Sequence, residues 1–205
     1  MNLSKEIHEI LFVVIFIVFL LVGWVFFHYF FKVPTQAILV PVVVSTVIPP
    51  EIEKINSGLP IRIKIPNIKV DALVEQVGLT QGGAMGVPEG PADVGWFNLG
   101  PRPGDIGSAV IAGHFGWSNN IPAVFDNLHK LNKGDKIYIE DDKGVTISFI
   151  VRESKRYDAN ADASDVFNSS DEKAHLNLIT CEGIWDIVSK GRPYRLIIFA
   201  DKEIN

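Results

Sequence analysis

The sequence of 205 residues has little cysteine and no run of basic residues. Its one thiol, Cys181, cannot pair within the chain, which excludes a secreted scaffold held together by disulfides. The 24 aspartate and glutamate residues outnumber the 19 lysine and arginine residues, for a formal net charge of −5. This balance offers no basic surface for a polyanion, so we expect no nucleic-acid partner.

Charged residues are also missing from one stretch near the N-terminus. Residues 10–31 contain no Asp, Glu, Lys or Arg over 22 positions. As a helix they would extend about 33 Å, and the hydrocarbon core of a bilayer is about 30 Å thick. The apolar part of a cleaved signal peptide is shorter, about 7–15 residues, and no small-residue cleavage pattern follows this stretch. We predict a single transmembrane anchor at 10–31.

The anchor divides the chain into a short tail, a stalk and one domain. The charges that flank the anchor are nearly balanced and decide little about orientation. The simpler arrangement has a cytoplasmic tail at 1–9 and everything after the anchor outside the cell. Residues 32–57 carry four prolines, which remove backbone donors and favour an extended stalk, although the valine-rich middle could also pack on the domain as an edge strand. A domain at 58–205 remains.

Short apolar alternations separated by glycine and proline predict strands in this domain. The predicted strands are 61–65, 72–79, 107–114, 136–140, 145–151, 176–181 and 194–200. Asn120 and Pro122 are typical of a helix start, and apolar residues follow at helical spacing as far as Leu131. Many short strands with one or two short helices favour an all-β fold, a closed β-barrel.

Cys181 and His114 are the first candidates for chemistry. Each ends a predicted strand, which would place it at a barrel rim, and glycines flank His114 at positions 113 and 116. An imidazole near a thiol raises its thiolate fraction or carries the proton of a leaving group. Sequence spacing does not prove that the two meet. A buried structural cysteine and a strand-end histidine with structural hydrogen bonds are the alternatives.

Arg195 is the third candidate, because it shares a predicted strand face with Ile197 and Phe199. We expect that face to point inward, where an arginine is costly unless it meets an anion or an oxyanion. The alternative is an edge-strand arginine paired with a surface carboxylate. Nearby Arg192 lies between Gly191 and Pro193, and we expect its guanidinium to be in water.

Together these residues resemble a sortase, one of the membrane-anchored cysteine transpeptidases of Gram-positive bacteria. The resemblance covers residues 58–201 and the N-terminal anchor and stalk. The matching stretches are Ile-Pro-Asn-Ile at 65–68, Gly-Trp-Phe at 95–97, Gly-Pro-Arg-Pro-Gly at 100–104, Ala-Gly-His at 112–114, Lys-Gly-Asp at 133–135, Leu-Ile-Thr-Cys at 178–181 and Arg-Leu at 195–196. The order of His, Thr-Cys and Arg is the family's. The segment after the cysteine, Glu-Gly-Ile-Trp-Asp at 182–186, departs from the best-known housekeeping members.

The resemblance implies an eight-stranded barrel and a specific reaction. Cys181 would cleave the Thr-Gly bond of an LPXTG-like sorting signal to give a thioacyl enzyme. An amine on a peptidoglycan precursor or a pilin would then resolve it. His114 would be the general acid and base, and Arg195 with the N–H after Cys181 would hold the oxyanion. No cofactor is implied, and the partners would be sorting-signal-bearing surface proteins at the cell membrane.

Other functions remain open at the level of sequence. A non-enzymatic surface β-domain, a peptidase that only hydrolyses, and an L,D-transpeptidase are alternatives, although the Ser-x-Gly-Cys setting of the last is absent. His114, His129, His175 and Cys181 lack the close-spaced pairs of a metal site. The acidic residues Asp158, Asp162, Asp165, Asp171 and Glu172 could bind Ca²⁺, but a solvated loop is the favoured interpretation.

Overall fold

The computed structural model of the chain describes residues 17, 20–27 and 57–204. Residues 20–27 are helical, and among the described residues no helix is long and apolar enough to cross a membrane. The chain divides into two compact units, Met1–Pro49 and Pro50–Asn205. The predicted tail at 1–9 and most of the anchor at 10–31 and of the stalk at 32–57 lie outside the described residues, so these remain predictions.

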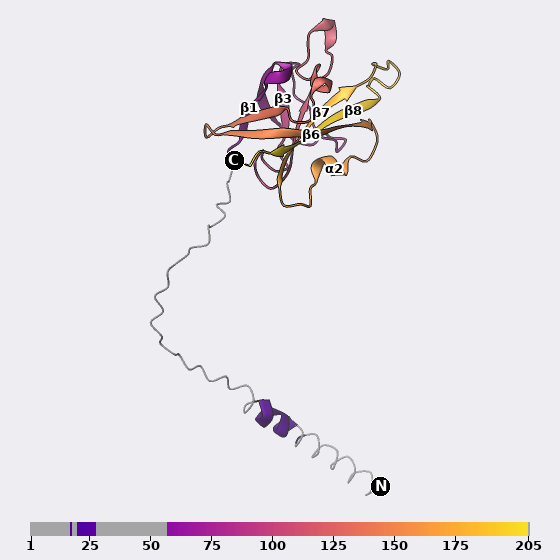
Figure 1. Cartoon of the computed structure of the whole chain (residues 1–205). Helices are drawn as coiled ribbons and strands as arrows, with labels where there is room; N and C mark the ends of the chain where they lie inside the picture. The colour runs from indigo at the N-terminus through magenta and orange to yellow at the C-terminus, as the bar shows by residue number, and fades with distance from the viewer. Residues whose placement is uncertain (1–16, 18–19, 28–56, 205) are drawn as a thin grey trace, which may run out of the picture. The chain divides into compact units, whose positions relative to one another are not determined.

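The second unit is a closed eight-stranded β-barrel (Figure 1), which confirms the predicted fold class. The strands are β1 (Pro60–Ile65), β2 (Val70–Val77), β3 (Val94–Phe97), β4 (Gly107–Gly113), β5 (Lys136–Asp141), β6 (Thr146–Asp158), β7 (Ala174–Glu182) and β8 (Tyr194–Lys202). Around the barrel their order is β1-β2-β3-β4-β7-β8-β6-β5, and β5 pairs with β1 to close it. The neighbours are antiparallel except for β2–β3 and β4–β7, which are parallel. Closure means that each of these eight strands has a partner on both sides, so none of them is an edge strand.

The strand alternation fills the barrel with aliphatic side chains. Ile63, Ile139, Leu178 and Ile198 are fully buried in one interior cluster. A second cluster lies on the outer face, where Val110, Val166, Ile197 and Phe199 pack together with Ile179 and Phe167 beside them. It is covered by the short helix α2 (Ser164–Phe167) in the β6–β7 connection. Because β8 is buried on both faces, its middle reads as a continuous apolar run, Leu-Ile-Ile-Phe-Ala at 196–200.

The predicted helix after Pro122 does not form as a regular α-helix. Residues 121–123 have no regular structure and residues 124–127 form a turn, with the 3-10 helices η2 (Ser118–Asn120) and η3 (Leu128–Lys130) on either side. The backbone N–H groups of Val124 and Phe125 donate to the carbonyls of Pro91 and His114 instead of to carbonyls four residues earlier. Phe125, Leu128 and Leu131 are still buried in the barrel. The apolar spacing therefore predicted which residues point inward, but not the local backbone.

Candidate active site

The pairing register brings the three predicted site residues to one end of three neighbouring strands. Parallel β4 and β7 pair Ala112 with Ile179, so His114 and Cys181, each two residues further on, are level on strands about 4.8 Å apart. Antiparallel β7 and β8 pair Cys181 directly with Arg195. Residues directly opposite each other on antiparallel strands share a face, so the thiol and the guanidinium point to the same side of the sheet. Cys181 is a free, half-buried thiol.

Thr180 fixes the end of β7 against the end of β4. Its hydroxyl is buried and donates a 2.8 Å hydrogen bond to the carbonyl of Gly113. Gly113 immediately precedes His114 and Thr180 immediately precedes Cys181. One hydrogen bond therefore sets the spacing of the backbone from which both candidate catalytic side chains project.

His114 is half-buried and held by two contacts. Its Nε2 lies 2.8 Å from the carbonyl of Pro88, and its ring meets the Trp117 ring edge-on with centroids 4.6 Å apart. A carbonyl only accepts, so Nε2 carries the proton and Nδ1 is left as the basic nitrogen. Among the contacts of the described residues there is no hydrogen bond between His114 and Cys181. In unliganded sites such contacts are often long and tighten only when substrate binds.

Arg195 lies on the outer face of the barrel, and the expectation of an inward face is wrong. Leu196 and Ile198 point into the interior cluster, whereas Ile197 and Phe199 belong to the outer one. The Arg195 Nη1 donates to the carbonyls of Arg192 and Tyr194, at 3.0 and 2.9 Å. Among the residues that the structure describes, no carboxylate forms an ion pair with Arg195. This excludes, for the described residues, the alternative of a surface ion pair.

Arg192 does not leave its guanidinium in water, so that expectation is also wrong. Its Nη1 donates to the carbonyl of Gly183, and its guanidinium carbon lies 4.8 Å from the centre of the Phe115 ring. Gly116 has a φ of +64°, and a Cβ there would come within 2.5 Å of Arg192 Nη2. The arginine therefore fills the space that this glycine leaves. It joins the loop after His114 to the loop after Cys181.

Two residues beside the thiol were not singled out as site residues by the sequence pattern. Glu182 forms a bidentate pair with Arg156, at 2.6 and 2.8 Å, and this hydrogen bonding holds the pKa of the Glu182 carboxyl below its ordinary value. His129 helps to line a cavity of about 60 Å³ that reaches Cys181. The other lining residues are Phe115, Phe125, Thr180, Glu182 and Leu196. The sequence analysis considered His129 only as a metal ligand. Only the assembled barrel brings η3 beside the end of β7, so no local pattern places His129 next to Cys181.

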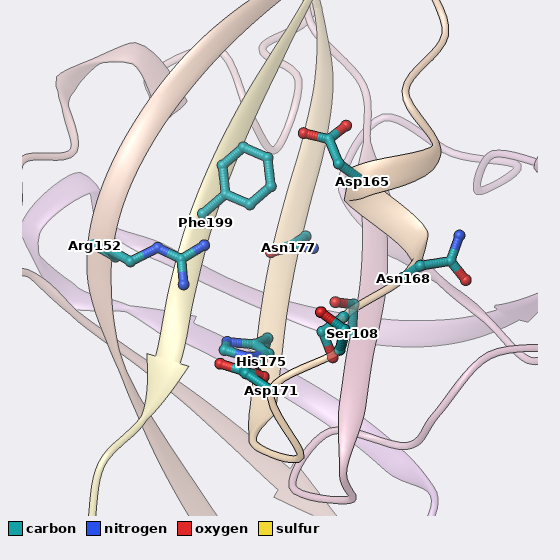
Figure 2. A pocket seen from close by; sticks show the side chains of 10 residues that line it. Ser108, Arg152, Asp165, Asn168, Asp171, His175, Asn177 and Phe199 are labelled. Atoms are coloured by element: carbon teal, nitrogen blue, oxygen red, sulfur yellow. Dashed lines mark hydrogen bonds and ion pairs between the residues drawn. The ribbon is translucent and has the colours of Figure 1, made fainter.

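A larger cavity, of about 250 Å³, lies elsewhere on the outer face, between the barrel and the loop after α2 (Figure 2). It is lined by His175 and Asn177 of β7, by Ser108, Arg152 and Phe199, and by polar residues of the loop. His175 lies six residues before Cys181 on the same strand, about 20 Å away. Its two ring nitrogens contact the carboxylates of Asp171 and Asp201, at 2.8 and 2.7 Å. This cavity holds none of the three predicted catalytic residues.

The side chains considered as metal ligands do not gather. Within residues 17, 20–27 and 57–204, no three His, Cys, Asp or Glu side chains are grouped so that they could hold a metal ion. Asp162 and Asp165 instead accept hydrogen bonds from the Ser164 N–H and the Tyr157 hydroxyl. The expectations about Ca²⁺ and about the absence of a cofactor stay predictions.

A thiol, an imidazole and a guanidinium that has no carboxylate partner among the described residues lie at one barrel end, and this arrangement suits acyl transfer. A family model of the sortase domain matches residues 63–203. The chain belongs to the sortase family. Sortases are cysteine transpeptidases, so the general activity follows from the family. No curated protein matches the chain.

Solved sortase structures share this fold. Sortase C-1 from Actinomyces oris is 24% identical with a TM-score of 0.54, over 71% of this chain and 76% of that one. A lid mutant of sortase A from Corynebacterium diphtheriae is 22% identical with a TM-score of 0.57, and the match covers 73% of this chain and 72% of that one. Sortase A from Listeria monocytogenes is 23% identical with a TM-score of 0.54, and the match covers 72% of this chain and 88% of that one. Both A-type and C-type sortases are thus similar in fold.

Proposed function

We propose that the protein cleaves an LPXTG-like sorting signal between Thr and Gly and transfers the new acyl end to an amine. The observation that carries this proposal is the strand register, which sets Cys181 opposite Arg195 and level with His114. A thiol nucleophile, a proton carrier and an oxyanion donor are the three groups that acyl transfer requires.

In the first half-reaction, the Cys181 sulfur attacks the threonine carbonyl carbon as a thiolate. The carbonyl oxygen becomes an oxyanion, which the Arg195 guanidinium and the backbone N–H of Glu182 stabilise. His114, protonated at Nδ1, gives that proton to the leaving glycine nitrogen as the C–N bond breaks. The products are a thioester on Cys181 and a free amine, with His114 neutral.

In the second half-reaction, neutral His114 takes a proton from the acceptor amine as its nitrogen attacks the thioester. The same donors stabilise the second oxyanion. The C–S bond then breaks, a new amide forms, and Cys181 leaves as a thiolate beside protonated His114. Water in place of the amine gives hydrolysis as a side reaction.

The outer apolar cluster fixes the strand ends that carry the thiol and the guanidinium. Ile179 is two residues before Cys181 and Ile197 two residues after Arg195, so both lie on the face that carries the thiol. Val110 and Ile197 are buried in this cluster with Val166 of α2. The cluster therefore supports the proposal by holding β7 and β8 in place beside the reaction centre.

The remaining parts of the proposal concern location and partners. We propose a single-pass membrane protein anchored by residues 10–31 with its catalytic domain outside the cell, which supports reaction with surface proteins and with a peptidoglycan-precursor or pilin amine. None of the steps above uses a cofactor. The family matched over residues 63–203 supports this placement.

The proposal is tested by asking whether an added amine diverts the reaction from hydrolysis to transfer. The full chain in detergent is incubated with an LPXTG-like peptide, with and without triglycine, and with EDTA in a parallel sample. We expect a transfer product that rises with triglycine at the expense of hydrolysis, equally with EDTA. Hydrolysis that triglycine does not change would favour a peptidase, and no turnover with an inert thiol would favour a non-enzymatic β-domain.

A further inference from the structure

The loop between β7 and β8 exposes four large apolar side chains to solvent. Ile184, Ile187 and Val188 are 89%, 82% and 92% exposed, and Trp185 is 54% exposed. The loop follows the nucleophile directly and projects beyond the barrel (Figure 1). Exposed apolar residues that cluster, unlike scattered ones, mark a surface that another phase or molecule covers.

The loop has a defined shape that holds these side chains outward. Asp186 and Gly191 pair within the loop, with backbone hydrogen bonds in both directions, and close the turn that carries Ile187 and Val188. Arg192 closes the loop onto the barrel through the Gly183 carbonyl. Ile184 and Trp185 lie just before the paired Asp186, and all four apolar side chains are exposed. We call residues 184–188 the tip of the loop. The tip is a projection, whereas a peptide-binding site would be a groove.

The one carboxylate in the tip is already satisfied by its own loop. Asp186 accepts hydrogen bonds from the N–H groups of Val188 and Ser189 and from the Ser189 hydroxyl. These three donors hold the pKa of Asp186 below its ordinary value, and they replace water around the carboxylate. Moving the tip out of water therefore strips fewer hydrogen bonds from this charge than from a free carboxylate.

The chemistry of the tip selects a bilayer surface as the occupant. A tryptophan beside branched aliphatic residues is typical of segments that sit at the boundary of headgroups and acyl chains. Lys190 lies two residues after Val188 and supplies a charge that anionic headgroups attract. The same chain carries the uncharged stretch 10–31, which would bring the domain to a bilayer.

We propose that the tip of the β7–β8 loop, residues 184–188, inserts into the headgroup region of the membrane that anchors the chain. This rests on the membrane location argued under the proposed function. Ile184 is three residues from Cys181, at most about 11 Å of extended chain, so insertion holds the thiol at the bilayer surface. Substrates tethered to lipid are then delivered directly to the thiol.

Tryptophan quenching by brominated lipid tests the insertion. The full chain is reconstituted into vesicles of phosphatidylcholine and phosphatidylglycerol, with bromine on acyl carbons near the headgroup. Trp24 lies in the stretch 10–31, so every sample carries Trp24→Phe. In this background we expect the brominated lipid to quench the tryptophan fluorescence. Adding Trp185→Phe should abolish this quenching, and adding the matched control Trp117→Phe should leave it in place. Equal fractional quenching with and without Trp185 would overturn the proposal.

A second variant separates insertion from the other occupants. Ile187→Ser with Val188→Ser alters only exposed side chains, so the thermal midpoint should hold while quenching of Trp185 is largely lost. The preference for a lipid-tethered over a free sorting peptide should also fall several-fold. If Trp185 were not quenched and the chain instead formed a dimer that this variant abolishes, the tip would bind a second copy of the chain. That result would overturn insertion. Quenching requires no turnover, so failure of the transpeptidase proposal would be seen separately. A chain that does not float with vesicles would overturn both the anchor and the insertion.

Discussion

At the scale of single residues, two arginines near the thiol have different contacts and should have different effects. Arg195 is opposite Cys181 and, among the described residues, has no carboxylate partner, so it can face an oxyanion. Losing one oxyanion donor costs about 10²–10³-fold in kcat. We expect that loss for Arg195→Ala, with poor rescue by Arg195→Lys because lysine lacks the planar fork.

Arg192 is the matched control, since it holds two loops and touches no reacting atom in the proposed mechanism. Its hydrogen bond and its contact with Phe115 together are worth about 1–2 kcal/mol, a factor of about 5–30 in the ordered population. Arg192→Ala should lose activity within that range, measured with one peptide and one amine. The reverse ranking of the two arginines would move the oxyanion role to Arg192.

His114 should be needed for proton transfer in both half-reactions. Proton transfer by a positioned side chain contributes about 10²–10⁴-fold, so His114→Ala should reduce kcat by at least that factor with the fold retained. The neighbouring imidazole of His129 gives the control, because it is exposed and His129→Ala should change kcat far less. Greater loss in the His129 variant would make His129 the proton carrier.

At the scale of elements, the spacing of β4 and β7 depends on the Thr180 hydroxyl. Thr180→Val keeps the shape but leaves the Gly113 carbonyl without this donor, a loss of about 1–3 kcal/mol. We expect a lower thermal midpoint and, because Gly113 and Thr180 each precede a catalytic side chain, a fall in kcat that exceeds any change in KM. Normal kcat in a destabilised Thr180→Val variant would show that the bond serves stability alone.

The strands and their candidate residues were predictable because the signals are local. Strand alternation and the positions of His114 and Cys181 at strand ends are visible within a few residues. The face of Arg195 was not, because β8 is buried on both sides and apolar residues there do not mark the interior. The contact of Arg192 with Phe115 joins residues far apart in sequence, so no local pattern reports it.

Elements whose backbone is set by distant partners were also missed. β3 has only four residues, one of them a glycine, and gains its order from pairing with β2 and β4. β6 continues to Asp158 through a charged stretch because β8 pairs with it from Phe149 onward, with one irregularity between Val151 and Glu153. The helix predicted after Pro122 lost its backbone donors to other segments. In each case tertiary contacts outweighed local propensity.

At the scale of the whole molecule, one buried carboxylate ties the start of the domain to the β5–β6 hairpin. Asp141 is buried and accepts from the N–H groups of Lys143 and Val145 with one oxygen and of Gly58 with the other. Burial raises the pKa of Asp141, but these donors outweigh burial and the net pKa lies below its ordinary value. Gly58 is therefore held against the β5–β6 hairpin, and Leu59 is held there by the neighbouring Asp142 carboxylate.

This carboxylate should make the domain sensitive to acid. A lowered pKa in the folded state gives stability that is present above the unfolded value, about 3.9, and is lost as the pH falls through the folded value. Asp141→Asn should cost about 1–3 kcal/mol at neutral pH, seen as a lower thermal midpoint. The difference in thermal midpoint between the Asp141→Asn variant and the unmodified chain should become smaller below about pH 4. The exposed Asp142 gives the control variant Asp142→Asn. If the difference in thermal midpoint caused by Asp141→Asn did not change with pH, the Asp141 carboxylate would not be the source of the acid sensitivity.

Cys181 carries the acyl group in the proposed mechanism, and intact-mass spectrometry of the full chain detects such an acyl-enzyme. The chain is mixed with an LPXTG-like peptide without an amine acceptor and quenched in acid, which preserves a thioester. We predict a mass increase equal to the peptide cleaved after threonine, located at Cys181 by fragmentation and absent in Cys181→Ala. Cleavage retained by Cys181→Ala, or an acyl group on another residue, would contradict the account.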